Sequence, residues 1–168
     1  MDTTLFTIGF AGKTAEQFFR LLQEAEVAKV LDIRENRVGQ LQGFAKHPDI
    51  AFFLERIVGA AYEYEPLLAP SPEIRKAYRV SRDWGQYEES FKRLMAERGV
   101  LDKMGSQPFE GRVALLCSEP GPEKCDRRLV AQLLAEHWAA AGHRFEVRHL
   151  GVEKPKRPSK RKKAKPHE

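Results

Sequence analysis

Two cysteines and several charged side chains surround a proline-glycine turn in the stretch RVALLCSEPGPEKCDRRLVAQLL. An apolar segment runs into Cys117 and Glu119, and the residues after the turn include Cys125, Arg127 and Arg128. A glutamate at the end of a strand can transfer protons to or from a substrate. A helix start and neighbouring arginines lower the pKa of a cysteine thiol. The stretch therefore combines the side chains of an acid–base site with those of a thiol site.

A second carboxylate, Asp32, lies with Arg34 at the end of the apolar segment AKVLDIR. Two carboxylates in one site can have pKa values that are pushed apart, so that one acts as an acid and the other as a base. We therefore name Asp32, Glu119 and Cys117 as the candidate catalytic residues. Two simpler interpretations stay open, because Asp32 could form a local ion pair with Arg34 on a solvated loop, and Cys117 could be a small buried apolar residue.

Basic, glycine and aromatic residues near the same strand ends could bind an anionic ligand. Guanidinium groups bind phosphate or carboxylate through two parallel hydrogen bonds, and helix N-termini attract anions. Aromatics at helical spacing, such as Trp84, Tyr87 and Phe91, are better explained as core or lid residues than as a base-stacking surface. The candidate ligand-binding residues are Gly9, Lys13, Arg34, Arg37, Phe44, Lys46, Cys125, Arg127 and Arg128.

Apolar segments alternate with helical patterns along the chain, which predicts an α/β fold. We expect a single domain with a mostly parallel five-stranded sheet and helices on both faces. The carboxyl ends of such strands lie at one rim, where ligands bind. The expected strands span 4–10, 28–34, 61–67, 112–118 and 145–151. The expected helices begin after Thr14 and at Pro48, fill 71–99 in two pieces, and span 122–141.

The charge of the chain is concentrated in its last residues. The formal net charge is +5, and residues 153–168 contain eight of the 29 Lys and Arg residues with two of the 24 acidic ones. This segment, with basic residues from Lys154 to Lys165, has no apolar periodicity, so we expect a disordered tail after a folded domain of residues 1–152. Such a tail favours a nucleic-acid or nucleotide partner through counterion release. A purely solubilising tail explains it equally well.

Several classes of protein and site are not expected. The sequence has no signal-peptide pattern and no membrane-spanning apolar run, which predicts a cytoplasmic protein without a membrane partner. The two cysteines, with seven residues between them, match no zinc pattern. We therefore expect reduced thiols, no metal and no cofactor. The oligomeric state stays open.

Three segments together resemble the family called domain of unknown function 488, DUF488. They are TIGFAGKTAEQFFRLL, VLDIRENRVGQLQGFAK and LLCSEPGPEKCDRRLVAQLL, and the resemblance covers residues 4–150. Asp126 stands where the family pattern has a histidine, so no role of that histidine transfers to this chain. The resemblance implies a fold and a motif set, and it implies no activity. The residues at the motif positions are Gly9, Asp32, Arg34, Phe44, Lys46, Cys117, Glu119, Cys125 and Arg127.

Three functions are compatible with these observations. The first is a nucleotide- or nucleic-acid-directed protein, possibly an enzyme with acid–base chemistry on a phosphate-containing substrate. The second is a non-catalytic nucleic-acid-binding module that depends on the tail. The third is a thiol-based or small-anion-binding protein that uses Cys117 and Cys125. That third function requires the two sulfur atoms to lie within disulfide reach and at least one of the thiols to have a low pKa.

Overall fold

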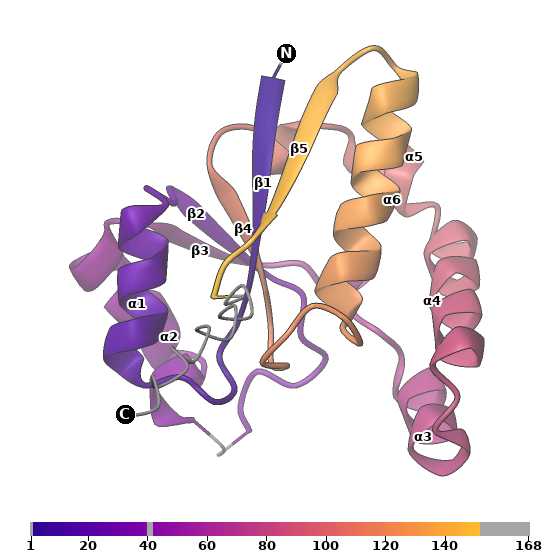
Figure 1. The fold of residues 1–168 in the computed structure, drawn as a ribbon, viewed down its shortest axis with the longest axis horizontal. Helices are drawn as coiled ribbons and strands as arrows, with labels where there is room; N and C mark the ends of the chain where they lie inside the picture. The colour runs from indigo at the N-terminus through magenta and orange to yellow at the C-terminus, as the bar shows by residue number, and fades with distance from the viewer. Residues whose placement is uncertain (1, 40–41, 152–168) are drawn as a thin grey trace, which may run out of the picture.

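A five-stranded sheet forms the centre of the molecule, with helices on both sides (Figure 1). The computed structural model describes residues 2–39 and 42–151. Every neighbouring pair of strands is parallel, in the order β3-β2-β4-β1-β5. The predicted α/β class is thus confirmed, and the sheet is entirely parallel. The strands are β1 Asp2–Gly9, β2 Lys29–Asp32, β3 Ala61–Tyr64, β4 Val113–Cys117 and β5 Arg144–His149.

The helices follow the predicted order, with one shifted start. Thr14 caps the first helix in a capping box with Gln17. The last helix begins at Asp126, because the Pro-Gly-Pro segment forms a loop and Cys125 is the N-cap; the predicted start at Pro122 was wrong. The helices are α1 Ala15–Glu24, α2 Asp49–Phe53, the π-helical η2 Leu54–Val58, α3 Pro72–Ser81, α4 Trp84–Arg98, α5 Val100–Met104 and α6 Asp126–Ala140, with short 3₁₀ turns η1 Gly43–Ala45, η3 Pro66–Leu68 and η4 Gln107–Phe109.

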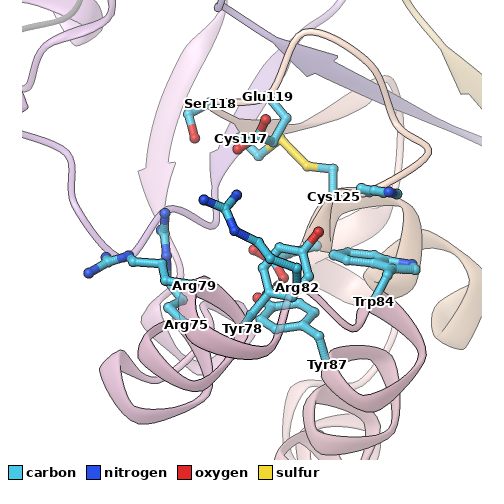
Figure 2. Close-up of a pocket in the computed structure, with 12 residues that line it drawn as sticks. Arg75, Tyr78, Arg79, Arg82, Trp84, Tyr87, Cys117, Ser118, Glu119 and Cys125 are labelled. Atoms are coloured by element: carbon cyan, nitrogen blue, oxygen red, sulfur yellow. Dashed lines mark hydrogen bonds between the residues drawn. A yellow bond between two sulfur atoms is a disulfide. The ribbon is translucent and has the colours of Figure 1, made fainter.

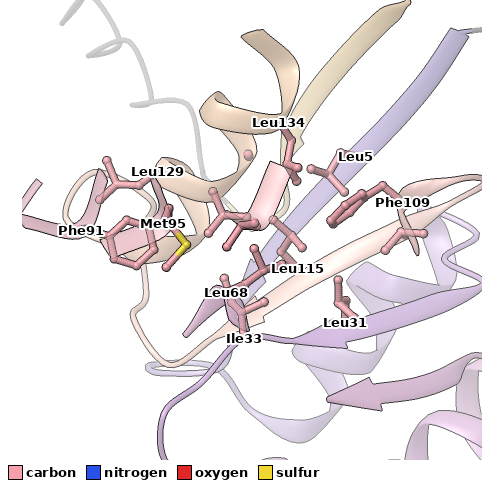
Figure 3. Close-up of a cluster of buried hydrophobic side chains, with 14 of the residues drawn as sticks. Leu5, Leu31, Ile33, Leu68, Phe91, Met95, Phe109, Leu115, Leu129 and Leu134 are labelled. Atoms are coloured by element: carbon pink, nitrogen blue, oxygen red, sulfur yellow. The ribbon is translucent and has the colours of Figure 1, made fainter. Parts of the chain in front are cut away.

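Each face of the sheet carries its own hydrophobic core, because side chains alternate along a strand. On one face, Leu5 and Leu115 pack with residues of α4, α5 and α6, including Phe91 (Figure 3). On the other face, Phe6 and Leu116 pack with residues of α1, α2 and η2. Strand β4 is buried at every position, which agrees with its place in the middle of the sheet.

The two cores fix where a crevice can form. Strands β1 and β4 are neighbours, yet β1 leads to α1 on one face and β4 leads to α6 on the other. Connections that leave neighbouring parallel strands toward opposite faces open a crevice at the carboxyl ends of those strands. The sequence after β4, which contains Cys117 and Glu119, lies at this point.

The proposed tail, residues 153–168, and the end of the proposed domain at residue 152 lie outside the described residues. Within residues 2–39 and 42–151, no helix has both the length and the apolar character needed to cross a membrane. The cytoplasmic location and the nucleic-acid partner stay predictions.

Candidate functional site

Two adjoining cavities lie at the carboxyl end of β4, with volumes of about 190 Å³ and 160 Å³. They share Arg75, Cys117, Ser118 and Asp126, and we refer to them together as the strand-end cavity. Figure 2 shows the larger part, with the residues at the end of β4 above and those of α3 and α4 below. The cavity therefore occupies the crevice that the topology creates.

A row of arginines from α3 forms one wall of the strand-end cavity. Arg75, Arg79 and Arg82 line it, joined by Lys124 from the loop before α6. Arg75 also lies 3.5 Å from a carboxylate oxygen of Glu35. Arg75 and Arg79, four residues apart, lie on one side of α3, and Arg82 follows at its C-cap. None of the three was predicted as a site residue, although the i, i+4 spacing of Arg75 and Arg79 was a signal that could have identified them.

The backbone conformation at the end of α3 determines the direction of the Arg82 side chain. Arg82 is the C-cap of α3 and has a left-handed conformation with φ of 56°. Its N–H donates to the carbonyl oxygen of Tyr78 at 2.8 Å. A left-handed conformation is uncommon for residues other than glycine and is found often at functional sites. The turn from α3 to α4 thus presents the Arg82 side chain to the cavity (Figure 2).

Aromatic rings form a second wall. Trp84 stacks on Tyr87 with ring centroids 5.0 Å apart, and Tyr78 meets the Trp84 ring edge-on at 5.6 Å. All three residues line the larger cavity. Phe91, one turn further along α4, is completely buried in the core. The core interpretation is therefore confirmed for Phe91 and Tyr87, both buried core residues, whereas Trp84 is only partly buried against the core.

The two carboxylates that line the larger cavity are Glu119 and Asp126. Burial raises the pKa of Asp126, the hydrogen bond from Tyr87 and the charge of Arg75 offset part of this rise, and the negative charge of Glu119 adds to it. The Tyr87 hydroxyl donates a hydrogen bond to the Asp126 carboxylate. Asp126 and Glu119 are thus the two carboxylates that this cavity brings together, in place of the predicted pair of Asp32 and Glu119. Asp126 was noted in the sequence only as a departure from the family pattern.

Asp32 lies in a buried network beside the cavity and does not line it. The carboxylate is completely buried and accepts hydrogen bonds from Arg34 Nε at 2.9 Å and Nη2 at 2.8 Å. The Tyr62 hydroxyl donates to the same carboxylate at 2.6 Å. Arg34, in turn, lines the smaller part of the cavity. The Asp32–Arg34 pair is therefore a buried ion pair that orients Arg34, and it does not lie on a solvated loop.

The end of β1 and the loop after β4 lie in close contact at Gly9 and Arg127. Arg127 is completely buried, and its Nη1 donates to the carbonyl oxygen of Glu119 at 2.7 Å and to Cys117 Sγ at 2.8 Å. A Cβ atom on Gly9 would overlap the same carbonyl oxygen of Glu119. Glycine is thus the residue that lets the two backbones approach this closely.

Cys117 and Cys125 are joined by a disulfide at the base of the cavity (Figure 2). The prediction of reduced thiols was therefore wrong for this structure. The two sulfur atoms meet because the loop between β4 and α6 folds back on itself. The predicted thiol site therefore meets its requirement of disulfide reach. Within the described ranges, no cluster of three or more His, Cys, Asp or Glu residues is arranged to hold a metal ion.

Two of the predicted ligand-binding residues stabilise parts of the fold away from the cavity. Phe44 packs against Phe18 and Phe19, with ring centroids 5.3 Å and 5.9 Å apart, over the α1 side of the sheet. The Arg37 guanidinium lies 3.6 Å from the centre of the Tyr64 ring. Neither residue lines the strand-end cavity.

Three more of the predicted cations, Lys13, Lys46 and Arg128, also lie outside this cavity. Lys13 lines a separate cavity beside α1, where burial and the charge of Arg127 lower its pKa. Arg128 Nε donates to the carbonyl oxygens of Pro122 and Glu123 and so stabilises the loop before α6. Lys46 lines neither part of the strand-end cavity. The cations that do line it come mainly from α3.

Stability at alkaline pH reports on the network around Asp32. Burial and the hydrogen bond to Asp32 raise the pKa of Tyr62 to about 12, from an unfolded value of about 10. The folded protein holds the Tyr62 proton more tightly than the unfolded chain does. The contribution of Tyr62 to the free energy of unfolding is therefore complete below pH 10 and is lost as the pH rises toward 12. We expect the urea midpoint to fall across this window more steeply in the wild type than in Tyr62→Phe. Equal slopes in the two proteins would contradict the prediction.

Comparison with known proteins gives a family and nothing beyond it. The family model described as "Domain of unknown function DUF488" matches residues 14–134. The matched part runs from the N-cap of α1 into α6 and includes every residue that lines the strand-end cavity except Phe10. Searches among curated proteins and among solved structures found no match to this chain.

Proposed function

Because the chain belongs to the DUF488 family, whose description assigns no activity, we propose a function from the strand-end cavity itself. The cavity binds a nucleotide, either free or as part of a nucleic acid, with its phosphate on the α3 arginines and its base beside Trp84. The observation that carries this proposal is the cavity wall in which Arg75, Arg79 and Arg82 stand next to the Tyr78–Trp84 aromatic pair.

The charge of the cavity and the geometry of its hydrogen-bond donors support the binding of a phosphate group. Guanidinium groups offer planar pairs of donors that match phosphate oxygens. Arg79 and Arg82 are exposed on the cavity side of α3, so their donors are available without breaking a buried ion pair. Lys124 adds a fourth positive charge from the opposite loop. The two carboxylates that line the larger cavity leave its lining with an excess of positive charge.

The aromatic wall supports the binding of a nucleobase. Trp84 is held by stacking on Tyr87 and by the edge-on contact with Tyr78. A fixed indole ring is a platform on which any nucleobase can stack, and such stacking contributes about 1–3 kcal/mol per base. Arginines alone would suit any phosphate or carboxylate, so the neighbouring rings favour a nucleotide.

An acid–base step on the bound phosphate ester would use Asp126 and Glu119. Burial raises the pKa of Asp126, which favours its protonated form and the role of acid. Glu119 is exposed in the same cavity and is the carboxylate available as a base. A non-catalytic binding module would keep its ligand unchanged, so product analysis with Glu119→Gln and Asp126→Asn separates an enzyme from a binding module.

Removal of one α3 arginine is expected to weaken phosphate binding. We expect Arg79→Ala to reduce the affinity for adenosine monophosphate about tenfold, since a charge-assisted hydrogen bond contributes roughly 1.5 kcal/mol or more. Titration calorimetry on the full chain measures this change. Lys76→Ala removes an exposed cation from the same helix, outside the strand-end cavity, and should change the affinity less than twofold.

Trp84→Leu tests the base separately from the phosphate. This variant should lower the affinity for adenosine monophosphate about tenfold and leave the affinity for inorganic phosphate unchanged. Equal losses for both ligands would mean that the cavity binds a small anion and no base. Loss of oligonucleotide binding in a chain that ends at Gly151, with no effect of Arg79→Ala, would instead favour a module that depends on the tail.

A further inference from the structure

Arg127 is a buried cation without a carboxylate partner. Its side chain is completely buried, and none of the ion pairs among the described residues includes it. Its Nε and Nη2 atoms have no hydrogen-bond partner in this part of the chain, while Nη1 bonds to Cys117 Sγ at 2.8 Å and Cys125 Sγ at 3.6 Å. Burial lowers the pKa of Arg127 to about 10, so the guanidinium is still charged at neutral pH.

A buried charge is costly unless an opposite charge lies beside it. The Glu119 carbonyl that accepts from Nη1 is neutral, and so are both sulfur atoms of a disulfide. A Cys117 thiolate, in contrast, would place a full negative charge within hydrogen-bond distance of Nη1. Glu119 and Glu123 raise the pKa of Arg127 through their charges, but neither forms an ion pair with it. Reduction of the disulfide therefore places a counter-charge in direct contact with the guanidinium.

We propose that Cys117 and Cys125 form a reversible dithiol–disulfide pair, in which Arg127 stabilises the Cys117 thiolate of the reduced form. This redox activity goes beyond the proposed nucleotide binding and does not depend on it. Cys117 lines both parts of the strand-end cavity and Cys125 lines one. The cavity is thus the route by which a small thiol or disulfide reaches the sulfur atoms.

Other charged side chains around Cys117 also affect the stability of its thiolate, the cations favouring it and the acids opposing it. The cations that line the cavity with it are Arg34, Arg75, Arg79, Arg82 and Lys124. The acids are Glu35, Glu119 and Asp126. Cations are in the majority, and burial raises the pKa of Asp126, which favours its neutral form. The surroundings therefore add to the effect of Arg127 on the thiolate.

The reaction balances as thiol–disulfide exchange with a small-molecule disulfide, R–S–S–R. The Cys117 thiolate attacks one sulfur and forms a mixed disulfide, and the first R–S⁻ leaves and takes up a proton. The Cys125 thiol then loses its proton and attacks Cys117 Sγ, which releases the second R–S⁻. Two protein thiols are oxidised to one disulfide, and one external disulfide is reduced to two thiols.

The test uses the full chain equilibrated in glutathione buffers, with the disulfide fraction measured by mass after alkylation. We expect the pair to interconvert, and we expect Arg127→Met to shift the equilibrium at least tenfold toward the disulfide. Arg128→Met is the matched control, because Arg128 bonds to backbone carbonyls of the loop and to neither sulfur. Equal shifts in the two variants, or no disulfide at any glutathione ratio, would overturn the proposal.

A second measurement does not require the Arg127 variant to fold. Cys125→Ser leaves Cys117 as the single thiol of the chain, and the absorbance of its thiolate near 240 nm reports its titration. We expect a pKa at least one unit below the ordinary value of about 8.5 for a thiol. A titration at 8.5 or above would show that Arg127 does not stabilise the thiolate, and the inference would fail whether or not the cavity binds nucleotides.

Discussion

Gly9→Ala is expected to destabilise the protein by at least about 3 kcal/mol, the upper part of the range for added methyl groups in packed sites. The new Cβ would overlap the carbonyl oxygen of Glu119 and Nη1 of Arg127, and it would lie 2.8 Å from the carbonyl carbon of Glu119. These are backbone and fully buried atoms, so no flexible side chain can move aside. Urea unfolding measures the loss as a lower midpoint.

Gly43→Ala is the control for this substitution. A Cβ at Gly43 would meet nothing within 4 Å, and the residue lies in the short η1 turn. Its free energy of unfolding should stay within about 0.5 kcal/mol of the wild type, as for most surface substitutions. Similar midpoints for the two variants would mean that the end of β1 and the loop after β4 are not held as closely as the structure shows.

Asp32→Asn should cost about 3 kcal/mol, because it leaves the buried Arg34 guanidinium without its counter-charge. The Arg34 and Asp32 side chains are 6% and 0% exposed, so water cannot replace the carboxylate. Tyr62 also loses the anionic acceptor of its hydrogen bond. Urea unfolding at neutral pH measures the loss, and nucleotide affinity should fall with it because Arg34 lines the cavity.

An exposed ion pair on the same sheet gives the comparison. Glu63 is 53% exposed and lies 3.4 Å from Lys29 Nζ. Glu63→Gln should change the free energy of unfolding by less than about 1 kcal/mol, because solvent screens such pairs. A loss for Asp32→Asn no larger than that for Glu63→Gln would show that the Asp32 network contributes little to stability.

The fold could be predicted from the sequence because each strand has either a continuous apolar run or an alternation of apolar and polar residues, as in β3 and β5, and each long helix has a capping residue or a regular apolar spacing. The segment around β4 shows this most clearly, since five apolar or cysteine residues in a row are all buried. The start of α6 was misjudged because proline is favoured in the first turn of a helix. Here Pro122 lies in the loop that carries the cavity residues.

The site was predicted only in part, for a topological reason. Residues that follow strands could be collected at one rim, which placed Cys117, Glu119 and Cys125 at the cavity. The arginines and aromatic rings of α3 and α4 follow β3 by many residues, so strand ends gave no indication of them. Only the path of the chain back across the sheet brings Arg75 and Trp84 to the end of β4.

The strand order also has a consequence for how the chain folds during synthesis. The first strand, β1, pairs with β4 and β5, so Leu5 meets Val113 and Asp2 meets Arg144. At roughly 5–20 residues per second, a ribosome needs several seconds or more to reach those partners after β1 has emerged. Contacts so distant in sequence slow folding. The apolar β1 segment must therefore remain unpaired until its partners emerge, and this interval is when the nascent chain is most exposed to aggregation.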